Sequence, residues 1–342
     1  MRRTARGGLS GCYPGRLTAA FWSCHERPAD TWADTGESNG TSVTDQQRKR
    51  AHHTVPRSHL ARFARPLRTR RGHPQLTRVE LPGTKRHPIS VTSATVETDF
   101  YLTHTANGAP SDAFEDQLSE VEAAAAAAVR HLVDDKAPLT QEDREWIAAW
   151  TTLQHLRTPG HRDLLAVAAE LTGEITGRSI GAELDHFPGP GPHTYTRHLS
   201  REDRERHRTT HLQSMIDNFR AGVDTLSGRA WTVVFFQKKT LITSDSPVTL
   251  LPIPGADVRT PLSLTSNNGV LVPLDRRAAL LMEEAAGGDR VIAGTAQLNR
   301  RLNQEIVNGA RRCVFHHPDD DPLAGLVLPE PREPRVMFER VF

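Results

Sequence analysis

The chain has 342 residues, of which 37% are hydrophobic and 25% are charged, and this composition supplies enough apolar material for one large domain or two small ones. No stretch of 18 residues lacks a charge, which argues against a membrane-spanning helix. The three cysteines, Cys12, Cys24 and Cys313, form no C-x-x-C pair. They therefore predict neither a disulfide framework nor a four-cysteine zinc site.

The net charge of +2 hides an uneven distribution of charge along the chain. Residues 1–90 carry 17 Lys and Arg against 6 Asp and Glu, whereas the remaining residues carry 26 against 35. A basic region attracts anionic partners. However, 38 of the 43 basic residues are Arg, and GC-rich codons also produce this bias, which weakens the inference of a nucleic-acid partner. The first residues fail as a secretory signal because Arg16 and several glycines interrupt the apolar core. A cytoplasmic location is therefore predicted.

The N-terminal quarter of the chain begins with a segment that has no apolar pattern, and a predicted short helix and β-hairpin follow it. Residues 1–50 alternate small, polar and basic residues without a helical or strand period, which predicts a disordered tail or an over-long start. Pro56 stands at the first position of a short amphipathic helix. Two strand-like runs, 76–81 and 89–96, are joined by Pro82-Gly83 and predict a β-hairpin.

The middle third of the chain has the apolar period of helices. From Phe114 to Leu132, apolar residues recur at alternating steps of four and three after the capping residue Asp112. Pro159 stops the second pattern, and Gly177 suits a left-handed cap after the third. The predicted helices cover 112–132, 141–156, 161–176 and 200–228.

From Trp231 the pattern changes to short β-branched and aromatic runs. These runs are closely spaced without long helices between them, which favours antiparallel pairing. The predicted strands cover 231–236, 241–243, 248–251, 270–274, 279–282, 291–293, 313–315 and 335–342, with one helix over 296–307. The predicted fold class is α+β, with an N-terminal short helix and β-hairpin, a central α-helical bundle and a C-terminal antiparallel sheet. It forms one domain over 51–317, followed by a tail over 318–342.

Motifs of three large enzyme classes are absent. The sequence contains no G-x-G-x-x-G after a strand, no G-x-x-x-x-G-K-[ST] and no G-x-S-x-G. His207 and His211 have the i, i+4 spacing of a zinc-binding pair, but Arg208 stands where a metalloprotease needs Glu. Two exposed histidines on an Arg-rich helix are the simpler interpretation. We therefore predict no metal site and no cofactor.

Three polar residues at element boundaries are candidates for a site. His53 precedes the first helix, where an imidazole can act as acid or base or simply mark the helix entry. Arg157 ends a helix, where a guanidinium can bind a phosphate or carboxylate or cap the helix carbonyls. Asp245 follows a strand, where it can close an Asx turn or serve as a catalytic carboxylate.

Seven short motifs occur in a recognisable order. They are His53-x-Val55-Pro56 with Leu60 and Phe63, Asp99-Phe100-Tyr101, the Glu- and Ala-rich helix around Glu120 to Leu132, Arg157-Thr158-Pro159, Trp231 with the strand into Ser244-Asp245-x-Pro247-Val248, Val272-Pro273-Leu274, and Leu298-Asn299. In these motifs and their order, the chain resembles the bacterial domain of unknown function 4238 family over about residues 50 to 317. Thr54 and Ser246 replace the Tyr and the Asn that the family usually has. The resemblance implies a set of residues and no known reaction.

The residues that the resemblance marks predict a shared pocket. His53, Arg157, Asp245 and Asn299 come from four separate segments. In such a pocket His53 would be general acid or base, Asp245 would orient it, Arg157 would hold an anion and Asn299 would donate to an oxyanion. A buried hydrogen-bond network that joins the segments is the alternative.

The predicted function is a water-mediated hydrolysis of a small anionic substrate, for which a phosphoester is the favoured class. This choice rests on the lack of a convincing Ser or Cys nucleophile. The alternative is a non-catalytic binding module that holds nucleic acid or an acidic protein through the basic N-terminal region. The sequence leaves the oligomeric state open.

Overall fold

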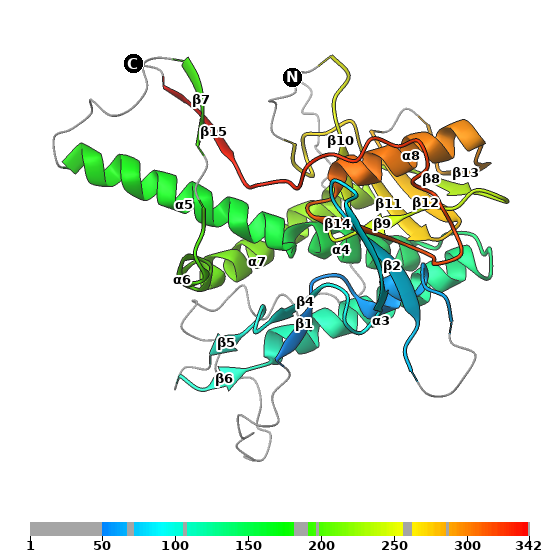
Figure 1. Cartoon of the computed structure of the whole chain (residues 1–342), viewed down its shortest axis with the longest axis horizontal. Coiled ribbons are helices and arrows are strands. Elements are labelled where there is room, and N and C mark those ends of the chain that lie inside the picture. The colour runs from blue at the N-terminus through cyan, green and yellow to red at the C-terminus, as the bar shows by residue number, and fades with distance from the viewer. Residues whose placement is uncertain are drawn as a thin grey trace, which may run out of the picture.

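The computed structural model describes residues 50–66, 72–104, 108–180, 191–195, 198–255, 262–284 and 287–340. Figure 1 shows how their helices and strands are arranged. The predicted N-terminal tail, apart from Arg50, lies outside the described residues. No helix within those ranges is both long enough and apolar enough to cross a bilayer.

A five-stranded sheet forms the middle of the fold. Its strands follow the order β10-β11-β12-β8-β13. Their bounds are β8 (Ala230–Phe235), β10 (Thr249–Leu251), β11 (Gly269–Asp275), β12 (Ala278–Glu283) and β13 (Arg290–Ala293). Neighbours pair antiparallel except β13, which runs parallel to β8. The prediction of a wholly antiparallel sheet is therefore wrong at this edge.

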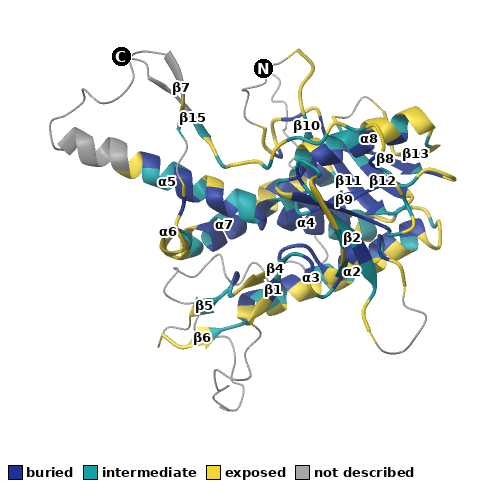
Figure 2. Cartoon of the chain, viewed as in Figure 1, coloured by how far each residue is buried: buried dark blue, intermediate teal, exposed yellow. Residues whose placement is uncertain are grey.

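Side chains of the central sheet alternate between two hydrophobic cores, because successive residues of a strand point to opposite faces. Trp231 and Val233 of β8 belong to one core, together with residues of the helices Ala113–Val133, Gln141–Leu156 and Arg208–Ser227. Val234 belongs to the other core, together with residues of the helix Ala296–Gly309 and of a second, four-stranded sheet. Figure 2 shows buried residues concentrated in the sheet and on the helix faces against it.

The helical layer follows the apolar stripes of the sequence. Its helices are α3 (Ala113–Val133), α4 (Gln141–Leu156), α5 (Pro159–Ile180), α6 (Arg201–Arg206) and α7 (Arg208–Ser227). A capping box between Thr140 and Asp143 fixes the start of α4. The predicted end of the third helix at Gly177 is wrong, because α5 continues to Ile180. A single glycine costs a helix only about 1 kcal/mol.

The predicted helix over 200–228 is two helices that meet at His207. The backbone of His207 leaves the helical region at φ −90° and ψ 5°. Its side chain lies 2.8 Å from a carboxylate oxygen of Glu170 on α5. The apolar pattern of the sequence continues through this position, so it gave no sign of the break. The contact with Glu170 joins two segments that are distant in the sequence.

The second sheet has the order β3-β2-β14-β9. Its strands are β2 (Gln75–Glu80), β3 (Lys85–Ser90), β9 (Thr243–Ser244) and β14 (Cys313–His316), next to the helices α2 (Arg57–Ala61) and α8 (Ala296–Gly309). The predicted hairpin is confirmed, with its second strand shifted toward the turn. The mixture of helices with mainly antiparallel strands confirms the predicted α+β class.

Three small strand pairs complete the described fold, and they were not predicted as pairs. They are β1 (Ala51–His53) with β4 (Val96–Thr98), β5 (Thr103–His104) with β6 (Pro110–Ser111), and β7 (Gly191–Tyr195) with β15 (Val336–Arg340). The first pair matters most, because it places the segment around His53 beside the segment 99–101. In the C-terminal segment Leu323 is buried in the second core.

Candidate functional site

Two of the four predicted site residues lie in one polar cluster. Arg157 follows α4 and is only 1% exposed. Its Nη1 donates to Glu122 at 2.5 Å, and its Nε and Nη2 donate to Gln154 at 3.0 and 2.7 Å. Gln154 in turn donates to the carbonyl oxygen of Thr54 at 2.8 Å. All three guanidinium nitrogens therefore donate to protein side chains.

His53 ends β1 beside this cluster. Its Nε2 lies 3.2 Å from the carbonyl oxygen of Thr92, and since a carbonyl only accepts, Nε2 carries the proton. Burial lowers the pKa of His53. The hydrogen bond to Thr92 acts in the opposite direction, and the charges of Glu122 and Arg157 also act on this pKa. The ring is therefore neutral at pH 7.

Tyr101 also belongs to this cluster. In the sequence analysis it is part of a motif, but no role is predicted for it. It is fully buried, and its hydroxyl has no hydrogen-bond partner among the described residues. Its backbone N–H donates to Nδ1 of His52 at 2.8 Å, and the two rings stack at 5.5 Å. Burial raises its pKa, on which the charges of Arg157 and Glu122 also act. Only its place in the motif Asp99-Phe100-Tyr101 marked it in the sequence.

Asp245 and Asn299 make their contacts elsewhere. The carboxylate of Asp245 accepts from the backbone N–H groups of Arg311, Arg312 and Cys313 at 2.9, 2.8 and 3.3 Å, which fixes the entry to β14. Burial raises the pKa of Asp245, and these three bonds lower it in part.

On α8, Asn299 donates to the carbonyl oxygen of Thr240 at 3.1 Å and accepts from Asn303 at 3.3 Å. These contacts join α8 to the segment before β9. No contact between described residues links Asp245 or Asn299 with His53 or Arg157. The structure thus brings two of the four residues together, and the catalytic roles of the other two stay predictions.

A cleft lies next to the segment 97–100, and it was not predicted from the sequence. It is a cleft of about 710 Å³, between the start of α5, α6, the first residue of α7 and the turn before β14. Its charged lining residues are Arg50, Arg162, Arg201, Arg204, Arg208, Arg311 and Arg312, with Glu97, Asp99, Asp163 and Glu205. Seven arginines against four carboxylates make it a basic site, called here the arginine cleft.

Arg162 is the buried arginine of the arginine cleft. It is 6% exposed, and its guanidinium lies 3.4 Å from the ring centre of Phe100. Nη2 donates to the carbonyl oxygen of Phe100 at 2.5 Å, and Nε donates to Nδ1 of His211 at 3.1 Å. Within the described ranges no carboxylate forms an ion pair with Arg162, and Nη1 has no partner. Burial lowers the pKa of Arg162 to about 10, so the group is still charged at pH 7.

His211 holds Arg162 without neutralising it. Because Arg162 donates to Nδ1, this nitrogen is the acceptor and Nε2 carries the proton. Nε2 then donates to the carbonyl oxygen of Leu156 at 2.9 Å. Burial and, to a smaller extent, the charge of Arg162 lower the pKa of His211 to about 3. The buried cation is thus fixed by a neutral base.

Asp163 positions two further arginines of the cleft. It is 2% exposed, and its carboxylate pairs with Arg204 at 3.1 Å and with Arg311 through its other oxygen. A buried carboxylate shared by two guanidinium groups leaves one positive charge in excess. Asp163 therefore orients the arginines without cancelling their charge.

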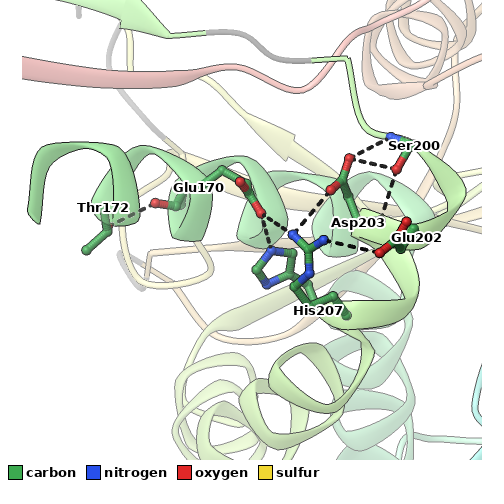
Figure 3. A network of polar contacts seen from close by, with 8 residues as sticks. Glu170, Thr172, Ser200, Glu202, Asp203 and His207 are labelled. Carbon is green, nitrogen blue, oxygen red and sulfur yellow. Dashed lines mark hydrogen bonds and ion pairs between the residues drawn. The ribbon is translucent and has the colours of Figure 1, made fainter. Parts of the chain in front are cut away.

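The helix α6, which carries Arg201 and Arg204, is braced against α5. Figure 3 shows His207 facing Glu170 and the capping box between Ser200 and Asp203. Arg206 adds ion pairs to Glu170 and Asp203 at 3.2 and 3.4 Å. These contacts stabilise a helix of six residues, which is too short to be stable on its own.

The comparisons with known proteins place the chain in a family. Residues 51–320 match the family model described as protein of unknown function, DUF4238. The chain belongs to this family. No curated protein and no solved structure matches it.

In this DUF4238 protein the arginine cleft can bind anions. Arg208 donates to the carbonyl oxygen of Asp99 at 3.2 Å, and Arg312 is exposed with no side-chain partner within the described ranges. Together with Nη1 of Arg162 they offer donors that no protein carboxylate uses. Planar guanidinium forks match the oxygens of phosphate and carboxylate.

Proposed function

We propose that this DUF4238 protein binds a small phosphate-bearing anion of nucleotide size in the arginine cleft. The observation that carries the proposal is the buried guanidinium of Arg162 without a carboxylate partner. An isolated buried charge is costly unless it is paired. A ligand phosphate at Nη1 would supply the missing negative charge.

Size and multiplicity of charge favour a phosphate ester over a simple carboxylate. A cleft of about 710 Å³ lies in the range of cavities that hold drug-sized ligands. Arginines stand on several of its walls, so a ligand with two or more phosphates meets more than one of them. Two donors without carboxylate partners, on Arg208 and Arg312, support the same ligand class.

Hydrolysis of that ligand extends the proposal. The charges of Arg157 and Arg162 both act on the pKa of Tyr101, which supports a polar cluster close to the cleft. His53 is neutral, which is the form that a general base needs. The alternative, nucleic-acid or acidic-protein binding through the basic N-terminal region, concerns residues largely outside the described ranges, and the cytoplasmic location stays a prediction.

Binding of ADP should be measurable by isothermal titration calorimetry at low salt. We expect ADP and pyrophosphate to bind and adenosine not to bind. Replacing Arg208 or Arg312 by Gln should weaken ADP binding about tenfold each, because each removes one charge-assisted contact. Both side chains make few protein contacts, so the variants should fold normally.

The matched control is Arg220→Gln, on the same helix α7 as Arg208 but outside the lining of the cleft. Its affinity for ADP should equal that of the unmodified protein. Unchanged ADP binding in both cleft variants, or no binding of ADP at millimolar concentration, would contradict the proposal.

A further inference from the structure

A second cavity lies between α2, α3, α4 and β11, and it shares no lining residue with the arginine cleft. Its volume is about 190 Å³, and its walls are mostly apolar, with Ala125, Val129, Trp150 and Leu274 among them. An engineered cavity of about 150 Å³ with apolar walls is known to bind benzene. The space is therefore sufficient for one aromatic ring.

A neutral imidazole is the most deeply buried polar group of this cavity. His59 is 6% exposed, and its Nε2 lies 2.9 Å from the hydroxyl of Thr243. Its ring packs against Trp150 and Phe63, with centres 5.2 and 5.3 Å apart. Burial lowers its pKa to about 3, so it carries no charge at pH 7. Nδ1 has no partner within the described ranges, and it can hydrogen-bond to a ligand.

Of the charged lining residues, Arg130 alone lacks a partner within the described ranges. Arg62 pairs with Asp134 at 2.6 Å, and Glu122 pairs with Arg157 at 2.5 Å. Arg130 stands in the last turn of α3, is exposed and forms no ion pair with another described residue. The cavity thus joins an apolar interior to a single uncompensated positive charge.

We propose that this cavity binds a small planar aromatic acid, with one ring and one carboxylate. The ring would pack against Trp150 and Val129, and the carboxylate would pair with Arg130. The uncompensated charge of Arg130 disfavours a cationic ligand, and the volume of about 190 Å³ excludes a long aliphatic chain. The proposal does not depend on the ligand of the arginine cleft.

Benzoate is the probe, with benzyl alcohol and benzylamine as uncharged and cationic counterparts of similar size. Saturation-transfer NMR and calorimetric titration should show benzoate binding with a dissociation constant of about 1 mM or tighter. Benzyl alcohol should bind more weakly, and benzylamine should not bind. Replacing Arg130 by Gln should weaken benzoate binding about tenfold and leave benzyl alcohol unchanged.

Two further variants make the test specific for the cavity. Ala126→Phe, at a half-buried lining position, fills the space and should abolish binding of both benzoate and benzyl alcohol. Arg220→Gln, which lies outside the cavity, should change neither affinity, and a thermal melt checks that each variant is folded. The proposal is overturned if benzoate does not bind at about 10 mM, if Arg130→Gln binds it unchanged, or if benzyl alcohol binds the unmodified protein as tightly as benzoate does.

Discussion

Lowering the pH from 7 to 5 is expected to destabilise this protein by about 6 kcal/mol. The cause is three histidines that are neutral in the folded state, the buried His59 and His211 and the half-buried His155. Burial lowers the pKa of His59 to about 3, of His155 to about 4 and of His211 to about 3. A histidine in the unfolded chain has a pKa near 6.5.

The direction of the effect follows from where the protons bind. Below pH 6.5 the unfolded chain takes up a proton at each of these positions, whereas the folded protein does so only near pH 3 to 4. The stabilisation is therefore complete above pH 6.5 and is lost as the pH falls toward the folded pKa values. Each histidine contributes about 2 kcal/mol of loss between pH 7 and pH 5.

Urea unfolding at pH 7, 6 and 5 measures this dependence. His59→Gln removes one of the three groups and should flatten the pH dependence by about one third, while it lowers the stability at pH 7 through its lost contacts. His104→Gln, at an exposed position of β5, should leave the pH dependence unchanged. A free energy of unfolding at pH 5 within about 1 kcal/mol of that at pH 7 would contradict the burial of these rings.

Replacing Arg157 by Ala should lower the free energy of unfolding by about 3 to 5 kcal/mol. The side chain is buried, and its loss leaves the carboxylate of Glu122 and the amide oxygen of Gln154 without their donor. His53→Ala should cost only about 1 kcal/mol, because His53 is half-buried and makes a single hydrogen bond of 3.2 Å.

A double variant separates the ion pair from simple packing. Arg157→Met combined with Glu122→Leu removes both charges and keeps apolar volume, so it should recover much of the stability lost in Arg157→Ala. Chemical denaturation of the three variants measures this. A loss below about 1 kcal/mol in Arg157→Ala would instead agree with an open, ligand-binding arginine, as the sequence predicted.

The sequence predicted elements whose causes are local. The helix α4 begins at a capping box formed by Thr140 and Asp143, three positions apart, and α3 follows an apolar stripe of regular helical period. Features that depend on contacts between distant segments were missed. The break at His207, the pairing of β1 with β4 and the parallel strand β13 each depend on a partner far along the chain.

The same division applies to the candidate site. Residues at element boundaries stand out in a sequence, but Asp245 fixes a turn and Asn299 joins two segments, and their residue types do not distinguish these roles from catalysis. The arginine cleft was missed because its arginines come from five separate segments and stand among many surface arginines. Only burial sets Arg162 apart, and burial at one position depends on the assembled fold.

The most direct test of the central claim is a crystal structure of the protein with ADP. The claim is that the buried guanidinium of Arg162 has no protein carboxylate partner because a ligand anion pairs with it. A phosphate oxygen of ADP should then lie about 3 Å from Nη1 of Arg162, with Arg208 or Arg312 on the same ligand. ADP bound outside the arginine cleft, or a protein carboxylate on Nη1 of Arg162 in its place, would contradict the claim.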